Sequence, residues 1–67
     1  MNIQTAITIL FNEGYLITLN PDGDTITISN PNSGTRVPTI QNLLQPYNTN
    51  FLTFTQLDDS TQIYFHS

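Results

Sequence analysis

The chain has 67 residues, among them five carboxylates, one arginine, one histidine, no lysine and no cysteine, which gives a formal net charge of −4 at pH 7. This length allows one domain, residues 1–67, with a core so small that a partner or self-association would add to its stability. The absence of cysteine excludes disulfides and thiolate metal sites. Nucleic-acid affinity and adsorption to anionic membranes both require several basic groups. With Arg36 as the only strong cation, we expect neither nucleic acid nor membrane as a partner.

The composition predicts an uncharged polar surface. Asn, Thr, Gln and Ser make up 28 of the 67 residues, and such a surface suits packed assemblies. No basic segment followed by an apolar run begins the chain, and no apolar run is long enough to span a bilayer. We therefore expect a cytoplasmic protein, or a virion protein if it is viral, that contacts a protein partner or itself.

The first predicted element is a helix over residues 2–13. Its apolar residues recur at the spacing of one helical face: Ile3, Ala6, Ile7, Leu10 and Phe11. Asn2 can cap the first turn, and Gly14 can end the helix in a left-handed conformation. The alternative is a strand, because three isoleucines and two threonines weaken the helix propensity of this segment. In that case the protein would be mostly β.

The next segment carries the clearest pattern in the chain, that of a β-hairpin. Apolar residues alternate with threonines over residues 15–19 and 25–29, which predicts strands with isoleucines toward a core and threonines toward solvent. Residues 20–23, Asn-Pro-Asp-Gly, fit a type I turn followed by a left-handed glycine. The same acidic turn resembles the start of a calcium loop. However, Thr25 and Pro31 stand where that loop needs glycine and glutamate, so we assign the segment to turn chemistry.

Residues 30–38 predict a loop, because they contain two prolines and a glycine. Arg36 lies in this loop, where it can form a surface ion pair with an aspartate or contact a partner protein. A short helix is predicted over residues 39–47, with Thr39 as its cap and with Ile40, Leu43 and Leu44 as its apolar face.

Two further strands are predicted in the last part of the chain. Residues 51–57 and 62–66 alternate between apolar and polar side chains, and residues 57–61 form the turn between them. The chain as a whole then predicts an α+β fold of order αββαββ, with an antiparallel sheet and two short helices on one face. The expected core is Ile7, Leu10, Ile17, Ile26, Ile28, Leu43, Leu44, Leu52, Phe54, Ile63 and Phe65.

Several of these features occur together in a known family. A helix ending in Leu10-x-x-x-Gly14 precedes Ile17-x-Leu19, an acidic glycine turn, Ile26-x-Ile28 and Pro31, and then Leu43-Leu44 and Phe51-Leu52-x-Phe54. In this order, residues 5–54 resemble the TubC-type N-terminal docking domain of modular biosynthetic enzymes. The resemblance implies a helix–hairpin–helix adaptor, often dimeric, that binds the terminus of another protein. Here Pro46 and residues 48–50 break the last helix, the basic residues usual in that family are absent, and residues 55–67 are additional.

Few residues could carry chemistry. His66 is the only histidine, and a Ser–His–Asp site needs a rigidly placed one, which a penultimate residue seldom is. The chain also lacks cysteine and lysine, so most nucleophiles and general bases are missing. Asp58 and Asp59 are expected to form a solvated turn. We therefore expect no enzyme activity, no catalytic residue, no cofactor and no metal.

The candidate contact residues are Arg36, Tyr47, Phe51, Tyr64 and His66. Phe51 and Tyr64 are expected to share the sheet face opposite the helices, where they would form an apolar patch suited to an interface. The strand over residues 62–66 is expected at the edge of the sheet, where the lack of lysine invites pairing with a partner strand.

These features predict a non-enzymatic structural or accessory subunit of a larger assembly, such as a virion-type decoration protein. The alternative is an adaptor or inhibitor that binds one specific host protein, such as a phage-type anti-defence protein.

Overall fold

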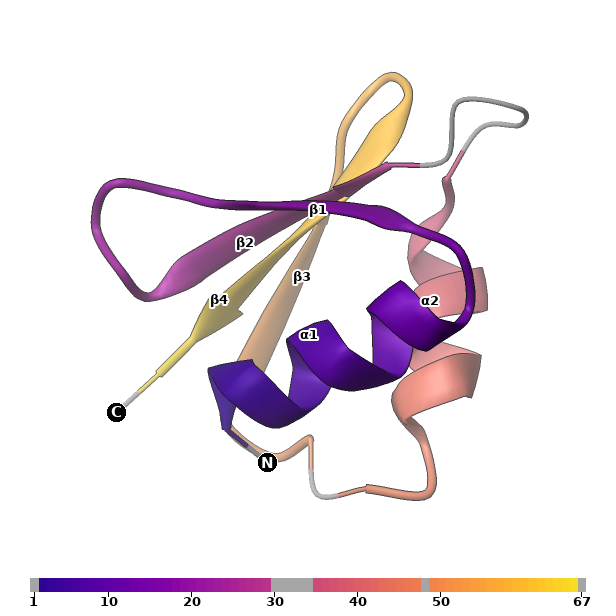
Figure 1. The fold of residues 1–67 in the computed structure, drawn as a ribbon, viewed down its shortest axis with the longest axis horizontal. Coiled ribbons are helices and arrows are strands. Elements are labelled where there is room, and N and C mark those ends of the chain that lie inside the picture. Colours follow the sequence, from indigo (N-terminus) through magenta and orange to yellow (C-terminus); the bar gives the residue numbers. More distant parts are fainter. Residues whose placement is uncertain (1, 30–34, 48, 67) are drawn as a thin grey trace.

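The computed structural model describes residues 2–29, 35–47 and 49–66, and its elements follow the predicted order. They are helix α1 (Ile3–Asn12), strands β1 (Leu16–Leu19) and β2 (Thr25–Ser29), helix α2 (Val37–Leu44), and strands β3 (Leu52–Gln56) and β4 (Ser60–Phe65). The strands form one antiparallel sheet, and both helices lie on the same face of it (Figure 1). The predicted α+β class is confirmed, and the mostly β alternative is wrong.

Two parts of the predicted connections, residues 30–34 and Asn48, lie outside the described residues. Within the described ranges, no helix is long and apolar enough to cross a membrane.

Helix α1 begins and ends where its caps predict. The side chain of Asn2 accepts the N–H of Thr5 at 2.8 Å, and Gly14 ends the helix at a φ of +92°. Leu10 is completely buried, but Phe11, the last residue of the predicted apolar face, is 70% exposed. One position after Leu10, Phe11 lies about 100° further around the helix, beyond the margin of the stripe that faces the sheet.

The turn between β1 and β2 has the predicted chemistry. The N–H of Gly23 donates to the carbonyl of Asn20 at 3.0 Å, and Gly23 has a φ of +78°. Asp22 ties the turn to the second strand, because its carboxylate accepts the N–H groups of Asp24 and Thr25 and the hydroxyl of Thr25, all within 3.0 Å. These bonds favour the ionised form and lower the pKa of the Asp22 carboxyl, the Asp24 N–H contributing most.

Helix α2 starts earlier than predicted. Arg36 is its N-cap residue, without a side-chain cap bond, and Thr39 lies inside the helix rather than at its cap. The reason is Pro38, whose fixed φ and missing N–H suit the first turn of a helix. The fully buried side chains of α2 are Ile40 and Leu44.

The two hairpins join through their second strands, so the sheet order is β1-β2-β4-β3. The prediction that residues 62–66 form an edge is therefore wrong, because β4 is central and β1 and β3 are the edges. Ser60 and Thr61, predicted as part of the turn, belong to β4 and pair with β2. The second strand of each hairpin carries fully buried side chains, Ile28 in β2 and Ile63 in β4, which explains why these strands take the centre.

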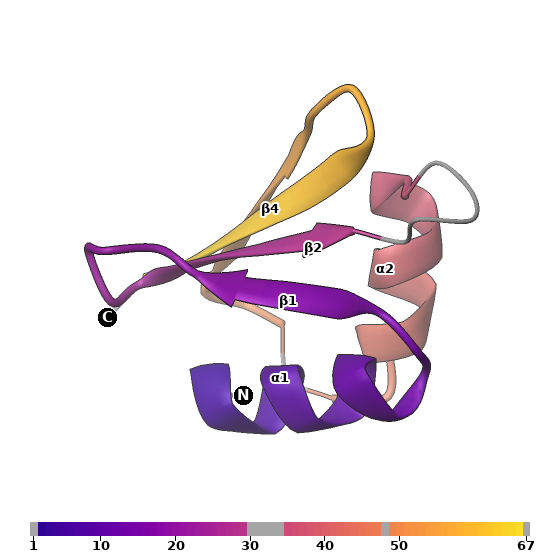
Figure 2. The ribbon, with the colours of Figure 1, turned by 45° about the horizontal axis from the view of Figure 1, so that its top comes forward.

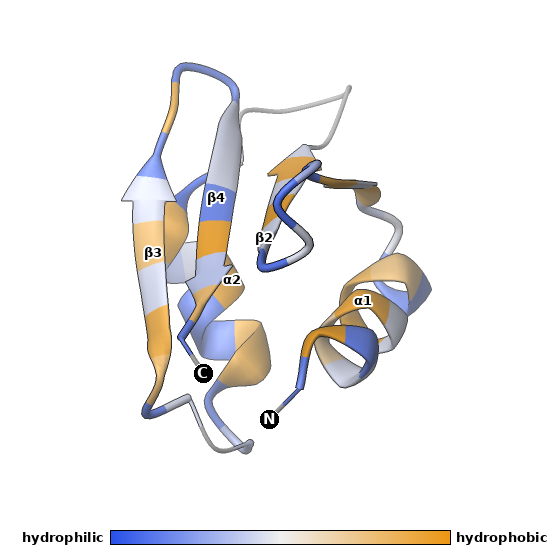
Figure 3. Ribbon diagram, turned by 90° about the vertical axis from the view of Figure 1, so that its left-hand side faces the viewer, coloured by the Kyte–Doolittle hydropathy of each residue, from blue (hydrophilic) through white to orange (hydrophobic). Residues whose placement is uncertain are grey.

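The core lies between the sheet and the helices, with α1 beneath β1 (Figure 2). It comprises Ala6, Leu10, Ile26, Ile28, Ile40, Leu44, Ile63 and Phe65. The other predicted core residues, Ile7, Ile17, Leu43, Leu52 and Phe54, are partly buried and pack against it. Apolar and polar residues alternate along β3 and β4, as Figure 3 shows, so one face of the sheet is apolar and the other is polar.

Candidate protein-contact surface

The face of the sheet opposite the helices, here called the outer face, is uncharged. The strand register places ten side chains on it: Leu16, Thr18, Thr25, Thr27, Ser29, Thr53, Thr55, Ser60, Gln62 and Tyr64. Seven of the ten are threonine or serine residues, and both helices lie on the opposite face of the sheet (Figure 2). Thr25 is buried at the end of this face, where its hydroxyl donates to the carboxylate of Asp22. This confirms the alternation that predicted isoleucines inward and threonines outward.

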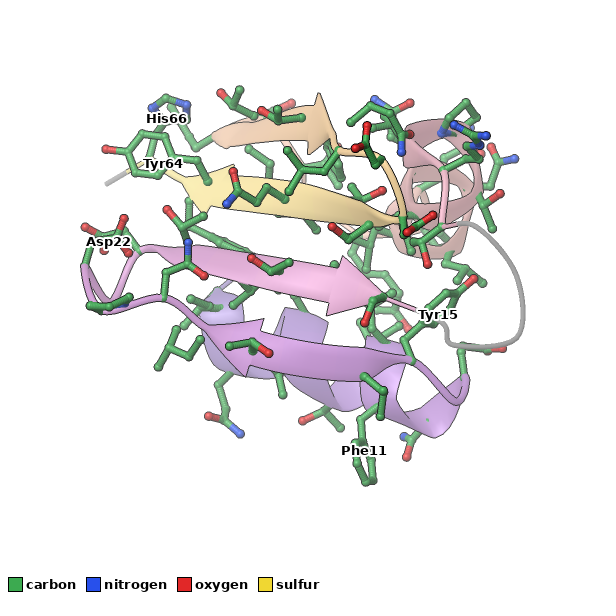
Figure 4. The ribbon with its side chains drawn as sticks, turned by 90° about the horizontal axis from the view of Figure 1, so that it is seen from above. Phe11, Tyr15, Asp22, Tyr64 and His66 are labelled. Carbon is green, nitrogen blue, oxygen red and sulfur yellow. The ribbon has the colours of Figure 1, made fainter. Side chains whose placement is uncertain are left out.

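Aromatic side chains gather at one corner of the outer face, where β4 ends and β3 begins. Tyr64 pairs with Thr53 in the strand ladder, and His66 follows just beyond it. The rings of Tyr64 and His66 lie edge to face, with centroids 4.4 Å apart (Figure 4). Phe51 is opposite His66, whose N–H donates to the Phe51 carbonyl at 2.8 Å. We call Phe51, Thr53, Tyr64 and His66 the aromatic corner.

His66 is held on three sides, although it is the penultimate residue. Its backbone bonds to Phe51, its ring packs on Tyr64, and its Nε2 forms a short hydrogen bond with the hydroxyl of Thr53. A hydroxyl beside an imidazole is part of a nucleophilic site, but such a site also needs a group that orients the second ring nitrogen. Among the described residues, nothing bonds to Nδ1 of His66. The arrangement fixes a rigid, exposed pair of rings.

The other two candidate contact residues do not join the corner. Arg36 and Tyr47 lie just before and just after α2, in the helical layer. Tyr47 is 46% exposed, and its N–H donates to the carbonyl of Leu44. Arg36 is exposed and has no carboxylate partner among the described residues, so the expected ion pair with an aspartate is not formed.

The aromatic corner is accompanied by a second exposed region that the sequence did not single out. Leu16 and Leu19 of β1 are 58% and 54% exposed, and Phe11 of α1 points out past β1 (Figure 4). The shortness of β1 between two turn segments could have indicated this exposed region, because a short strand at the margin of a sheet leaves part of its side chains uncovered.

The hydrogen bonds of the Gln56 side chain at the β3 edge, here called the latch, were also not predicted. The Gln56 side chain accepts the N–H of Val37 at 2.8 Å and donates to the carbonyls of Thr35, Leu57 and Ser60 at 2.7–3.1 Å. It thereby joins the start of α2 to the turn between β3 and β4. Glutamine on an alternating strand gives no sequence signal for such a role, because the partners at the start of α2, Thr35 and Val37, lie 21 and 19 residues away.

Within the described residues, no group of three histidine, cysteine or acidic side chains could hold a metal ion. The Asp22 turn uses its carboxylate for its own backbone, as turn chemistry predicts. Comparison of the chain with protein-family models, with curated proteins and with solved structures found no match, and the TubC-type resemblance stays a prediction.

Proposed function

We propose that this protein is a small non-enzymatic cytoplasmic or virion protein that works through contacts with other proteins, as a structural or accessory subunit of a larger assembly. The observation that carries the proposal is the aromatic corner on an uncharged sheet face. Aromatic side chains that are exposed and already fixed in position are typical of interface hot spots, and charged residues are depleted at interface cores.

The size of the corner supports a specific contact. Phe51 is 67% exposed and Tyr64 is 42% exposed, so their exposed parts together equal about one aromatic side chain, or roughly 200 Å². Burial of that area would contribute about 5 kcal/mol before the entropy of association is subtracted. Because the His66 and Tyr64 rings already hold each other, little further side-chain entropy would be lost on binding.

The small core supports membership of an assembly. Among the residues that the structure describes, eight buried hydrophobic side chains form it, and a chain of this size gains little stability beyond such a core. The surrounding Thr- and Asn-rich surface has few charges that would have to be desolvated when neighbouring subunits pack on it.

The second candidate is an adaptor or inhibitor that binds one specific host protein. The order of α1, then the β1–β2 hairpin, favours it, because the TubC-type resemblance implies a helix followed by a hairpin. In this case the chain alone would be a monomer, and the corner would be filled only by the host protein.

Light scattering at micromolar concentration tests the proposal and separates the two candidates. For an assembly subunit we expect a mass several times 7.6 kDa, reduced to the monomer by Tyr64→Asp. Thr55→Asp is the matched control, because Thr55 lies on the same outer face, away from the corner, and should leave the mass unchanged.

A monomer that unfolds reversibly would overturn the assembly proposal and leave the adaptor. An assembly unaffected by Tyr64→Asp would remove the aromatic corner from its interface.

A further inference from the structure

The aromatic corner has a negatively charged turn beside it. The N–H of Phe65 donates to the carbonyl of Asp24 at 2.8 Å, so the hairpin turn adjoins the end of β4. Bonding alternates along an antiparallel pair, so Tyr64 and Thr25, the next pair along, have no hydrogen bond between them and their side chains lie close together. The Thr25 hydroxyl donates to the carboxylate of Asp22, and Figure 4 shows Asp22 and Tyr64 at the same end of the sheet.

The Asp22 carboxylate can accept one more hydrogen bond. Its Oδ1 accepts the N–H groups of Asp24 and Thr25, whereas its Oδ2 accepts only the Thr25 hydroxyl. A carboxylate oxygen has two acceptor positions, so one on Oδ2 stays open among the described residues. The Asp22 side chain is exposed, and its hydrogen bonds, that of the Asp24 N–H first, lower its pKa and keep it ionised. A cation stacked on the Tyr64 ring can therefore donate to this oxygen.

The only lysine or arginine of the chain, Arg36, lies at the opposite end of the sheet. It is followed by Val37, whose N–H donates to the side chain of Gln56, the last residue of β3. The aromatic corner lies where β3 begins, and the strand spans roughly 13 Å, so Arg36 does not reach the corner of its own chain. Arg36 is exposed and has no carboxylate partner among the described residues.

A symmetric contact between two corners is disfavoured by charge. A two-fold interface sets the same patch on both sides, so it would bring Asp22 of one copy toward Asp22 of the other. Like charges placed opposite each other in an interface are strongly unfavourable. A head-to-tail contact instead sets the corner of one copy against a different surface of the next. Arg36 is the side chain of the second copy that can supply the opposite charge there.

We propose that copies of this chain associate head to tail, with Arg36 of one copy held in the aromatic corner of the next. The guanidinium would stack on the Tyr64 ring and donate to Oδ2 of Asp22, and Phe51 would cover the apolar stem of the arginine. The inference rests on the proposed function, in which the corner is the contact between subunits, and it names the residue that fills the corner. Because the contact joins two different surfaces, the assembly grows as a chain or a ring.

Two repulsive effects oppose this contact. Each copy carries a net charge of −4, but at physiological ionic strength this repulsion is screened beyond about 8 Å. Asp58 and Asp59 lie in the turn that the Gln56 side chain joins to the start of α2, so they accompany Arg36 toward the next copy. Burial of the rings therefore supplies the affinity, and the pair of Arg36 with Asp22 selects which surface the rings meet.

Two variants that each lose one side of the contact test the proposal. Arg36→Glu keeps the corner and reverses the charge that enters it, and Phe51→Ser/Tyr64→Ser keeps Arg36 and removes the rings. All three side chains are exposed, so both variants should fold, which circular dichroism checks. By light scattering, each alone should be a monomer at a concentration at which the wild-type chain assembles. Mixed in equal amounts, they should form a one-to-one complex and nothing larger, because only one contact remains intact.

Three further variants isolate the charge. Arg36→Lys keeps the cation and should retain the assembly. Asp22→Asn should weaken the contact at least about fivefold, whereas Asp58→Asn, which changes the net charge equally at the other end of β3, should not weaken it. If Arg36→Glu does not fold, Arg36→Gln takes its place, with a dissociation constant at least about tenfold above that of the wild-type chain.

The proposal is overturned if Arg36→Glu assembles like the wild-type chain while Phe51→Ser/Tyr64→Ser is a monomer, and the proposed function would then stand without it. It is also overturned if the two variants stay monomeric when mixed, because Arg36 and the corner then do not meet. A wild-type chain that is a monomer overturns the assembly itself together with this contact, and leaves the corner to a host protein.

Discussion

The two edges of the sheet are built differently. At β3, the Gln56 side chain bonds to α2 and to the next turn, and the N–H of Leu52 donates to the carbonyl of Thr49 at 3.3 Å. At β1, no described strand pairs with the side away from β2, and Leu16 and Leu19 are exposed. Leu52 and Phe54 in β3, by contrast, are half-buried.

The two edges therefore differ in how much changes to them should affect the stability of the fold. The β3 edge is tied down near both of its ends by contacts within the described chain, so loss of those contacts should lower the free energy of unfolding. At the β1 edge the leucines are exposed, so their truncation should leave stability nearly unchanged.

The largest expected effect is the difference in stability between two leucine-to-alanine substitutions, one in the core and one at the β1 edge. Leu44→Ala removes a fully buried side chain of α2 and should lower the free energy of unfolding by about 2–5 kcal/mol. Leu16→Ala removes a side chain of β1 that is 58% exposed and should change it by less than about 0.5 kcal/mol. Urea denaturation of both variants measures the difference. Equal losses would contradict the placement of Leu16 on the outer face, away from the core.

A smaller effect is expected at the latch. Gln56→Ala leaves the N–H of Val37 without its side-chain partner and the carbonyl of Thr35 with only the longer bond from the Thr61 hydroxyl, which should lower the free energy of unfolding by about 1–2 kcal/mol. Gln62→Ala is the matched control, because Gln62 lies on the open outer face of β4, and it should cost less than about 0.5 kcal/mol. If the two variants unfold at the same urea concentration, the β3 edge is not held by its glutamine.

The smallest effect concerns pH and the turn beside β1. Folding lowers the pKa of the Asp22 carboxyl below its ordinary value of 3.8, so the unfolded chain takes up this proton first. The stabilisation is therefore complete above about pH 4 to 5 and is lost as the pH falls through the lower pKa of the folded state.

Asp22→Asn should reduce the loss of stability between pH 6 and pH 2, measured by thermal unfolding. A variant at Asp22 that keeps the full acid sensitivity would show that these hydrogen bonds do not couple to folding.

Local sequence patterns predict most of the helices, strands and turns of the fold. The cap at Asn2, the alternation over residues 15–19 and 25–29, and the Asn-Pro-Asp-Gly turn each follow from neighbouring residues, and the structure confirms all three. The early start of α2 follows from Pro38 in its first turn, not from Thr39, the predicted cap.

The pairing of the hairpins could not be predicted in this way. Ile26 lies opposite Ile63 in the sheet, and no local pattern specifies which strand of one hairpin meets which strand of the other. For this reason the sequence predicts β4 at an edge, whereas in the structure β1 and β3 are the edges. The aromatic corner was partly predicted, since Tyr64, Phe51 and His66 come together, whereas Arg36 and Tyr47 lie at the ends of a helix.

The glycines on either side of β1 have a further consequence. Gly14 and Gly23 both have positive φ, and the chain turns at each, so β1 cannot grow beyond Leu16–Leu19. The unpaired edge of β1 is therefore only about 13 Å long. Sheets that grow without limit need long, flat edges, and this one ends after four residues. Because β1 is short, it is protected against uncontrolled aggregation, although it has no charged side chain that would prevent edge pairing.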